Sequence, residues 1–199
     1  MENRLPIVSE TAHSAAATGL RTAGVILGGS AFVAVCSHIS IPLWFTPVPL
    51  TLQPFAVLLV GLMLSPRVAA ATLGAYLLEG AAGLPVFAPG FTLGAGMAHL
   101  LGPTGGYLMS YPAAAALVSW MRSNVGRGFG GAALSAASGN AVILLCGFAW
   151  LARWTHAAAG PAFALAVLPF LPGDALKVVA AAGIARGWDR IRRDRYTYP

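Results

Sequence analysis

Long apolar runs recur along this chain, and they constrain its fold more than any other feature. Six segments stand out by hydropathy, at about 20–38, 50–64, 67–83, 104–121, 131–152 and 163–187. Their lengths approach the roughly 20 residues that an α-helix needs to cross a bilayer. Only 9% of the 199 residues are charged, against about 25% in ordinary soluble domains. The sequence therefore predicts an all-α integral membrane protein, a compact bundle of six transmembrane helices.

The basic residues lie mainly in short polar stretches between these segments, which is typical of topology determinants and not of a nucleic-acid surface. With six spans, both termini lie on one side of the membrane, and Arg153 is the only arginine on the other. The terminal side then holds ten arginines: Arg4, Arg21, Arg67, Arg122, Arg127, Arg186, Arg190, Arg192, Arg193 and Arg195. The positive-inside rule places both termini in the cytoplasm. We expect an N-terminal tail at 1–19, a membrane domain at 20–187 and a basic tail at 188–199.

Two connections on the predicted outer side, 39–53 and 84–103, contain no Asp, Glu, Lys or Arg and are rich in proline, glycine and aromatic residues. Irregular apolar backbone at membrane depth is tolerated where it lines a cavity or is buried in protein. We interpret both connections as lids over a pocket that opens outward. The alternative is that they anchor the protein at the interface through Trp44 and Phe45.

Two acidic residues stand inside apolar segments, Glu79 and Asp174, and the only lysine, Lys177, follows Asp174 on the same helical face. An ionisable side chain within the bilayer costs on the order of 3 kcal/mol, so it indicates a function by default. A purely structural ion pair is one interpretation. The preceding "LPFLPG" instead favours a discontinuous helix that lines a cavity. Such a site suits a ligand with an anionic end for Lys177 and N–H donors for Asp174.

Other polar residues leave alternatives open. Glu79 either completes the pocket or extends to the outer interface, and Gln53 either binds a ligand amide or caps a helix. The stretch "GPTGGYLMSYP" predicts a turn in which Thr104 caps the next helix and which also shapes the pocket rim. Asn140 is typical of a hydrogen bond between membrane helices.

Small residues recur at fourfold spacing in the first segment, where Gly24 and Gly28 form one pair and Ser30 and Ala34 another. They indicate either internal helix packing or a docking face for another membrane protein. The two cysteines and four histidines show no metal-ligand spacing, and no nucleophile–base constellation is present. We therefore expect neither a metal nor a cofactor, and no enzymatic activity.

The stretches "TPVPLTLQPFAVLLVGLMLSPR", "YLLEGAAGLPVFA", "GPTGGYLMSY" and "LPFLPGDALKVVAAAGIA" closely resemble the BioY family, the biotin-specific substrate-binding (S) components of energy-coupling factor (ECF) transporters. The resemblance covers about residues 20–186. It implies a six-helix bundle in the cytoplasmic membrane that captures biotin from outside. It also implies partners, a transmembrane coupling protein and a pair of ABC-type ATPases, with the first helix as the docking face.

The resemblance also assigns the family's Asp and Lys to Asp174 and Lys177. It suggests that Lys177 pairs with the biotin carboxylate and Asp174 with a ureido N–H, or the reverse. Family members can use an asparagine from the region of 84–103, which this sequence lacks. Glu79, Gln53 or Tyr107 are candidates to replace it.

A second hypothesis comes from a different class of transporter. The chain carries no nucleotide-binding motif, so any ATP dependence must come from partners. A stand-alone secondary carrier for a small carboxylate, in which Glu79 or Asp174 relays protons, is the alternative.

Overall fold

The computed structural model describes residues 7–89 and 96–197, and side chains over 17–89 and 96–194. Two short strands, β1 (Ser40–Ile41) and β2 (Leu50–Thr51), pair antiparallel with Ser40 opposite Thr51. The helices are α1 (Ile7–His38), α2 (Gln53–Met63), α3 (Pro66–Ala81), α4 (Met97–Leu101), α5 (Gly105–Val125), α6 (Phe129–Thr155), α7 (Ala159–Ala166) and α8 (Leu171–Thr197). The predicted all-α class is confirmed in these residues.

Each predicted apolar segment contains a helix, and the last is broken into α7 and α8, which meet at an angle of 47°. By length and composition, two described helices can cross a membrane alone, Ala17–His38 and α6. A third span results if the bent pair α7 and α8 is one span. The count of six transmembrane helices stays a prediction from the sequence.

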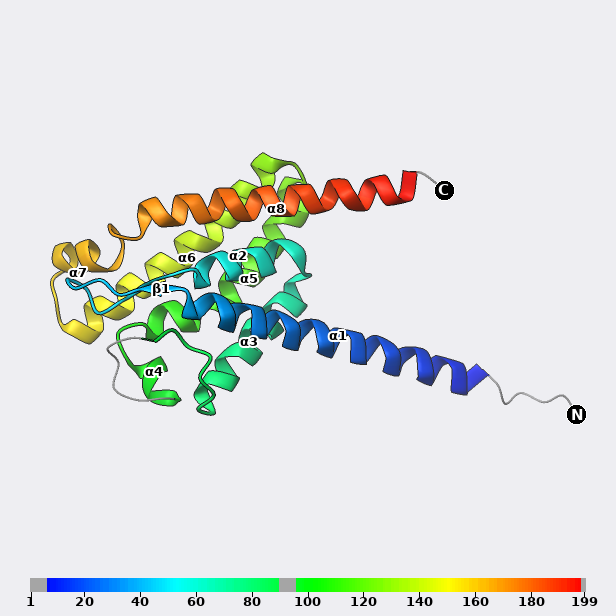
Figure 1. The fold of residues 1–199 in the computed structure, drawn as a ribbon, viewed down its shortest axis with the longest axis horizontal. Helices are drawn as coiled ribbons and strands as arrows, with labels where there is room; N and C mark the ends of the chain where they lie inside the picture. Colours follow the sequence, from blue (N-terminus) through cyan, green and yellow to red (C-terminus); the bar gives the residue numbers. More distant parts are fainter. Residues whose placement is uncertain (1–6, 90–95, 198–199) are drawn as a thin grey trace, which may run out of the picture.

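The predicted tails continue the terminal helices instead of forming separate segments. Helix α1 already begins at Ile7, and α8 runs on to Thr197 through the basic residues that follow position 188. Residues 1–6 and 198–199 lie outside the described residues. The outer parts of α1 and α8 project from one end of the bundle, whereas α4, α7 and the strand hairpin lie at the other end (Figure 1).

Helix α5 occupies the centre and packs against α6, α3 and α2, while α8 packs against α6 and α2. Glycines allow the close approach of α5 and α6. A Cβ atom built on Gly147 would lie 2.1 Å from the ring of Tyr107, so any side chain there would displace the tyrosine. This contact holds Tyr107 in place, and its hydroxyl donates to the Ala166 carbonyl oxygen at 2.7 Å.

The connections at the loop end are tied to the bundle by side-chain hydrogen bonds. The Val86 carbonyl oxygen accepts from Ser37 Oγ at 2.7 Å and from the Tyr76 hydroxyl at 2.9 Å. Thr46 Oγ1 donates to the Leu165 carbonyl oxygen at 3.0 Å. Backbone groups away from water need such partners. These bonds explain how apolar loops without regular structure pack over the ends of the helices.

Candidate ligand-binding pocket

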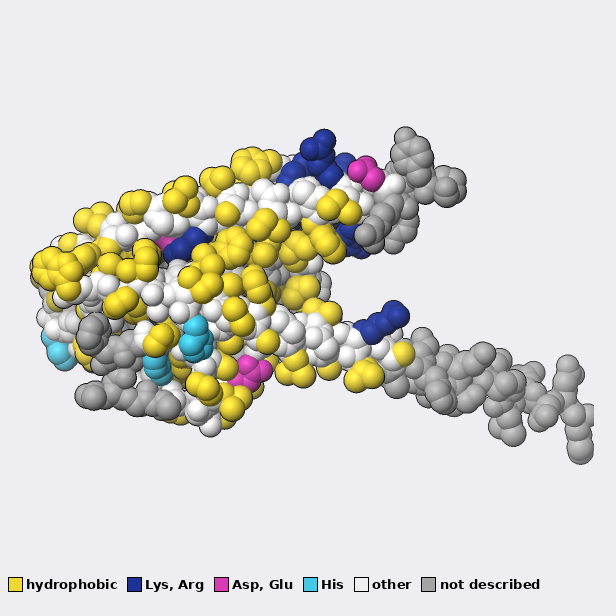
Figure 2. Space-filling model, viewed as in Figure 1, with side chains coloured by type: hydrophobic (Ala, Val, Ile, Leu, Met, Phe, Trp, Pro, Cys, Tyr) yellow, Lys and Arg dark blue, Asp and Glu magenta, His cyan; other side chains and the backbone are white. Residues whose placement is uncertain are grey.

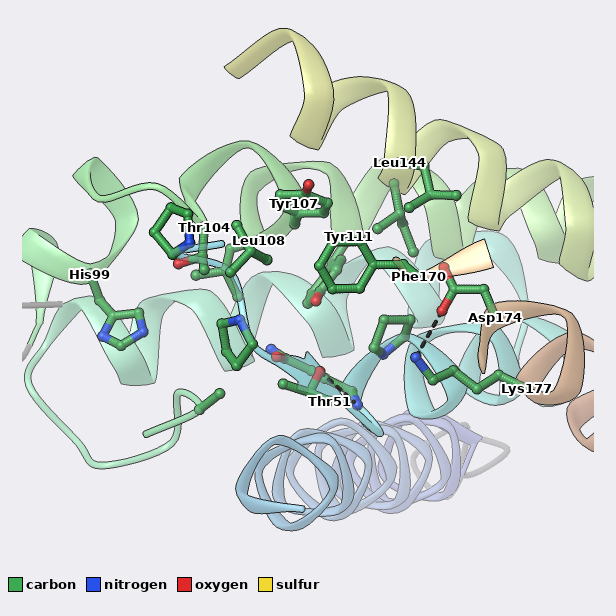
Figure 3. A pocket seen from close by; sticks show the side chains of 17 residues that line it. Thr51, His99, Thr104, Tyr107, Leu108, Tyr111, Leu144, Phe170, Asp174 and Lys177 are labelled. Carbon is green, nitrogen blue, oxygen red and sulfur yellow. Dashed lines mark hydrogen bonds and ion pairs between the residues drawn. The ribbon is translucent and has the colours of Figure 1, made fainter. Parts of the chain in front are cut away.

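A pocket lies where the two loop connections meet helices α2, α5, α6 and α8. Its empty space, with the open mouth included, is about 660 Å³. Small-molecule sites are commonly clefts with mostly apolar walls and a few polar groups. The lining residues are Pro47, Val48, Pro49, Thr51, Gln53, Pro54, Ala88, His99, Thr104, Tyr107, Leu108, Tyr111, Ile143, Leu144, Phe170, Asp174 and Lys177 (Figure 3).

The predicted charge pair is present in the pocket wall. Lys177 Nζ lies 2.8 Å from Asp174 Oδ1, and the two residues are only 9% and 3% exposed. Helix α8 begins just before them, with Pro172 in its first turn, where a missing N–H is tolerated. Asp174 is itself in the first turn, where the helix dipole favours a negative charge. The break before α8 thus places an ion pair at the start of a helix and inside a pocket.

Asn140 of α6 completes the surroundings of this pair. Its Nδ2 donates to Asp174 Oδ2 at 3.2 Å, so both carboxylate oxygens of Asp174 accept a hydrogen bond. This confirms the expected hydrogen bond between helices, here from α6 to α8. Asn140 Oδ1 is buried and has no hydrogen-bond partner among the described residues. The amide therefore fixes the orientation of a carboxylate that lines the pocket.

Thr104 lies at the other end of the lining, near His99 (Figure 3). It precedes α5, but its side chain makes no capping hydrogen bond, so the expected cap is wrong. Its Oγ1 is buried without a partner among the described residues and lines the pocket. The turn shapes the pocket rim, as the sequence suggested, and it leaves a polar atom there that a ligand can satisfy.

Gln53 and Tyr107 also line the pocket, and each makes a side-chain hydrogen bond to the protein. Gln53 is 3% exposed, and its Nε2 donates to the Tyr76 hydroxyl at 2.7 Å. The Tyr107 hydroxyl is used by Ala166. The structure therefore places both residues in the wall, where they connect the lining to α3 and α7.

Glu79 differs from the prediction that it completes the pocket, because the structure places it outside the lining. It is half-buried between α3 and α1 and accepts a hydrogen bond from Ser30 Oγ. The reason is the rotation of α3, which directs this position toward α1. The two acidic residues that the sequence singled out within apolar segments are thus in different environments.

The four small residues of α1 do not share one face. Gly24 and Gly28 are exposed, with open space beside them. Ser30 is fully buried and Ala34 packs against the core. The prediction that Ser30 belongs to a docking surface is therefore wrong, because the protein itself covers this residue. The two glycines remain accessible to a partner.

The two loop connections line the pocket with some residues and expose others. Pro47, Val48 and Pro49 of the first and Ala88 of the second line the pocket, which agrees with lids. Trp44, by contrast, is 93% exposed and stands clear of the pocket, as an interfacial anchor would. Residues 90–95 of the second connection lie outside the described residues.

The apolar walls of the pocket were not predicted from the sequence. Tyr111 on α5 lies four residues after Tyr107, and Phe170 lies four residues before Asp174, so helical spacing from the predicted residues was an available signal. Ile143 and Leu144 follow Asn140 by one turn of α6 in the same way. Residues 47–49 belong to the connection that was predicted as a lid, but which of its residues would line the pocket had no such signal, because the path of a loop has no fixed period.

A bundle of apolar helices that holds a mostly apolar pocket with one buried ion pair defines a membrane protein that binds a small molecule. Residues 9–194 match the model of the BioY family, and the chain belongs to this family.

Known relatives agree with this assignment. The chain is 43% identical to the probable biotin transporter BioY of Pyrococcus horikoshii, over 70% of this chain and 79% of the relative. It is 34% identical to the biotin transporter BioY of Thermotoga maritima, over 83% and 94%. A solved structure of the S-component for biotin from an ECF-type ABC transporter superposes with a TM-score of 0.78 at 25% identity, covering 88% of this chain and 93% of that one.

Proposed function

We propose that this chain binds biotin with high affinity in the pocket described above and carries it across the cytoplasmic membrane as the S-component of an ECF-type ABC transporter. The observation that carries the proposal is the Asp174–Lys177 pair, buried in a pocket whose other walls are mainly apolar. Biotin combines an apolar bicyclic body and an aliphatic chain with a ureido group and a carboxylate. Its polar groups require a few well-placed partners in an otherwise apolar site, which is what this pocket offers.

The geometry of the pair supports one orientation of biotin. Because Lys177 Nζ and Asp174 Oδ1 are 2.8 Å apart, both meet the same end of an extended ligand. The ureido group carries an N–H donor directly beside a carbonyl acceptor, which complements a carboxylate beside an ammonium. It is also neutral, whereas the biotin carboxylate would be repelled by Asp174 at close range. We therefore orient the ureido ring toward the pair.

In this orientation the carboxylate points toward the opposite end of the lining. Thr104 Oγ1 lacks a partner among the described residues there, and α5 begins at Gly105. The first N–H groups of a helix favour an anion. This differs from the pairing of Lys177 with the carboxylate that the sequence suggested.

The proposal places the pocket on the outer side of the membrane and both termini in the cytoplasm. On the face drawn in Figure 2, Lys and Arg side chains gather on the outer part of α8, and Arg21 is exposed on the outer part of α1. Excess basic residues favour the cytoplasmic side. A transmembrane coupling protein and ABC-type ATPases would supply the energy for transport. The coupling protein would dock on the accessible face of α1 at Gly24 and Gly28.

The test is calorimetry on the detergent-purified protein with biotin, biotin amide and a biotin methylated at a ureido nitrogen. We expect biotin to bind tightly. Methylation of the ureido nitrogen should lower the affinity about 100-fold, since it removes a hydrogen bond to a charged group. Conversion of the carboxylate to the amide should lower the affinity less. Lys177→Met should weaken biotin and biotin amide by the same factor. A greater loss for biotin than for its amide would overturn the orientation, and no binding of biotin to the folded wild type would overturn the function.

Transport distinguishes the proposal from a stand-alone proton-coupled carrier. Uptake of labelled biotin in cells that contain the chain should stop when the partner ATPases are deleted. Uptake that survives this deletion but collapses with the proton gradient would support the carrier instead.

A further inference from the structure

A second hollow lies on the surface between α5 and α6, apart from the pocket. Its empty space, with the open mouth included, is about 930 Å³, and its lining combines small residues with Met109 and Trp150. Its lining is Gly106, Met109, Ser110, Ala113, Val142, Cys146, Ala149, Trp150 and Arg153, and none of these residues lines the candidate ligand-binding pocket. We refer to this set of residues as the α5–α6 groove.

The α5–α6 groove is apolar along its length and charged at one end. The Ser110 hydroxyl is already engaged with the Tyr107 carbonyl oxygen at 2.6 Å, and Trp150 Nε1 donates to the Gly102 carbonyl oxygen at 2.8 Å. Arg153 is exposed, and within residues 7–89 and 96–197 it makes no ion pair or hydrogen bond. The apolar surface of the groove therefore ends at the side chain of Arg153, which is available to pair with an anion.

The length of the groove matches one leaflet of a bilayer. Val142 and Arg153 are eleven positions apart on α6, which is about 16 Å along a helix. Half of the hydrocarbon core of a membrane is about 15 Å thick. Trp154, next to Arg153, is 48% exposed, and tryptophan favours the membrane–water interface. If the Val142 end of the groove lies at the middle of the bilayer, Arg153 at its other end lies at the depth of the lipid headgroups.

We propose that the α5–α6 groove is a binding site for an anionic phospholipid, with one acyl chain in the groove and the phosphate paired with Arg153. A phospholipid brings an anion and a hydrocarbon chain at the spacing that the groove presents. A second protein helix would instead need an acidic residue at this depth to satisfy the arginine. The groove is also linked to the turn before the pocket residue Thr104, because Trp150 bonds to Gly102.

Native mass spectrometry of the purified full chain provides the test, with phosphatidylglycerol and phosphatidylcholine of identical acyl chains as probes. We expect the wild type to retain phosphatidylglycerol preferentially. Arg153→Gln should lower this binding about fivefold, because a basic residue near an anionic lipid contributes about 1 kcal/mol. Arg153→Lys should restore it. Arg127→Gln is the matched control, since it removes another exposed arginine, two residues before α6 begins and at the opposite end of that helix from Arg153.

Filling the groove is the second arm of the experiment. Ala149→Leu should lower the binding of both lipids, whereas Ala141→Leu, an exposed alanine of α6 outside the groove, should not. Circular dichroism and size-exclusion chromatography establish that each variant is folded. Equal retention of both lipids by the wild type, unchanged binding in Arg153→Gln, or a dimer that Ala149→Leu dissociates would each overturn the proposal.

Discussion

Helix α8 carries an ion pair near each of its ends, and the two pairs differ in what they connect. Near its start, Lys177 and Asp174 are three residues apart on the same helix, with Nζ and Oδ1 separated by 2.8 Å. Near its other end, Asp189 pairs with Arg122 of α5, with Nη2 and Oδ2 separated by 2.6 Å. Both pairs are largely shielded, since the side chains are 10% and 4% exposed in the first pair and 8% and 18% in the second.

The difference lies in what each pair can contribute to the fold. Arg122 and Asp189 are 67 residues apart in sequence and lie on different helices, so their pair constrains the packing of α5 against α8. Lys177–Asp174 joins one turn of a single helix, so it adds little to the arrangement of the bundle. A buried pair is often no more stabilising than apolar side chains of the same size. We therefore expect the pair near the start of α8 to affect ligand binding and the pair near its end to affect stability.

The largest effect should come from Lys177→Met. We expect biotin binding to weaken about 100-fold, because a hydrogen bond to a charged group contributes up to about 3 kcal/mol. The measurement is calorimetry in detergent. The double variant with Asp174→Leu should unfold at a higher temperature than the single variant, since no unpaired charge is left, and still fail to bind. Recovery of binding in the double variant would contradict a ligand-binding role for the pair.

The next largest effect should come from Arg122→Met. We expect the free energy of unfolding to fall by about 2 kcal/mol, less than for a fully buried pair because Asp189 keeps some contact with water. Thermal melting followed by circular dichroism measures the loss, with the exposed Arg127→Met as the control. Biotin affinity should stay within about twofold of the wild type, as the pair is remote from the pocket. A large loss of affinity without a loss of stability would reverse the comparison.

Asn140→Leu should have an intermediate effect on binding. It removes the hydrogen bond that orients Asp174, so we expect biotin affinity to fall about tenfold. Ser138→Ala is a matched change on the same helix, where the exposed hydroxyl bonds only to the Leu134 carbonyl oxygen among the described residues. Equal affinities in the two variants would show that Asp174 needs no support from α6.

The smallest effect should come from Glu79→Gln, within about twofold in biotin affinity. The substituted amide retains an oxygen that accepts from Ser30, and the position does not line the pocket. Calorimetry and labelled-biotin uptake with and without a proton gradient are the measurements. A loss of tenfold or more would restore Glu79 as a pocket residue or as a proton relay.

The membrane class and the candidate charge pair could both be predicted from the sequence because they depend on local properties. Hydropathy adds up along a segment, so apolar runs of this length indicate helices in a bilayer. The neighbourhood of Asp174 and Lys177 follows from helical geometry at a spacing of three residues. The break before α8 was likewise visible in "LPFLPG".

Only the tertiary structure decided which polar residues meet. Asn140 reaches Asp174 across 34 positions, and Glu79 turns to Ser30 across 49, although both acids were candidates for the pocket in the sequence. Which side of a helix faces the pocket depends on its rotation against its neighbours. That rotation is set by the packing of all the helices together, for instance by the contact of Gly147 with Tyr107, and no single segment encodes it.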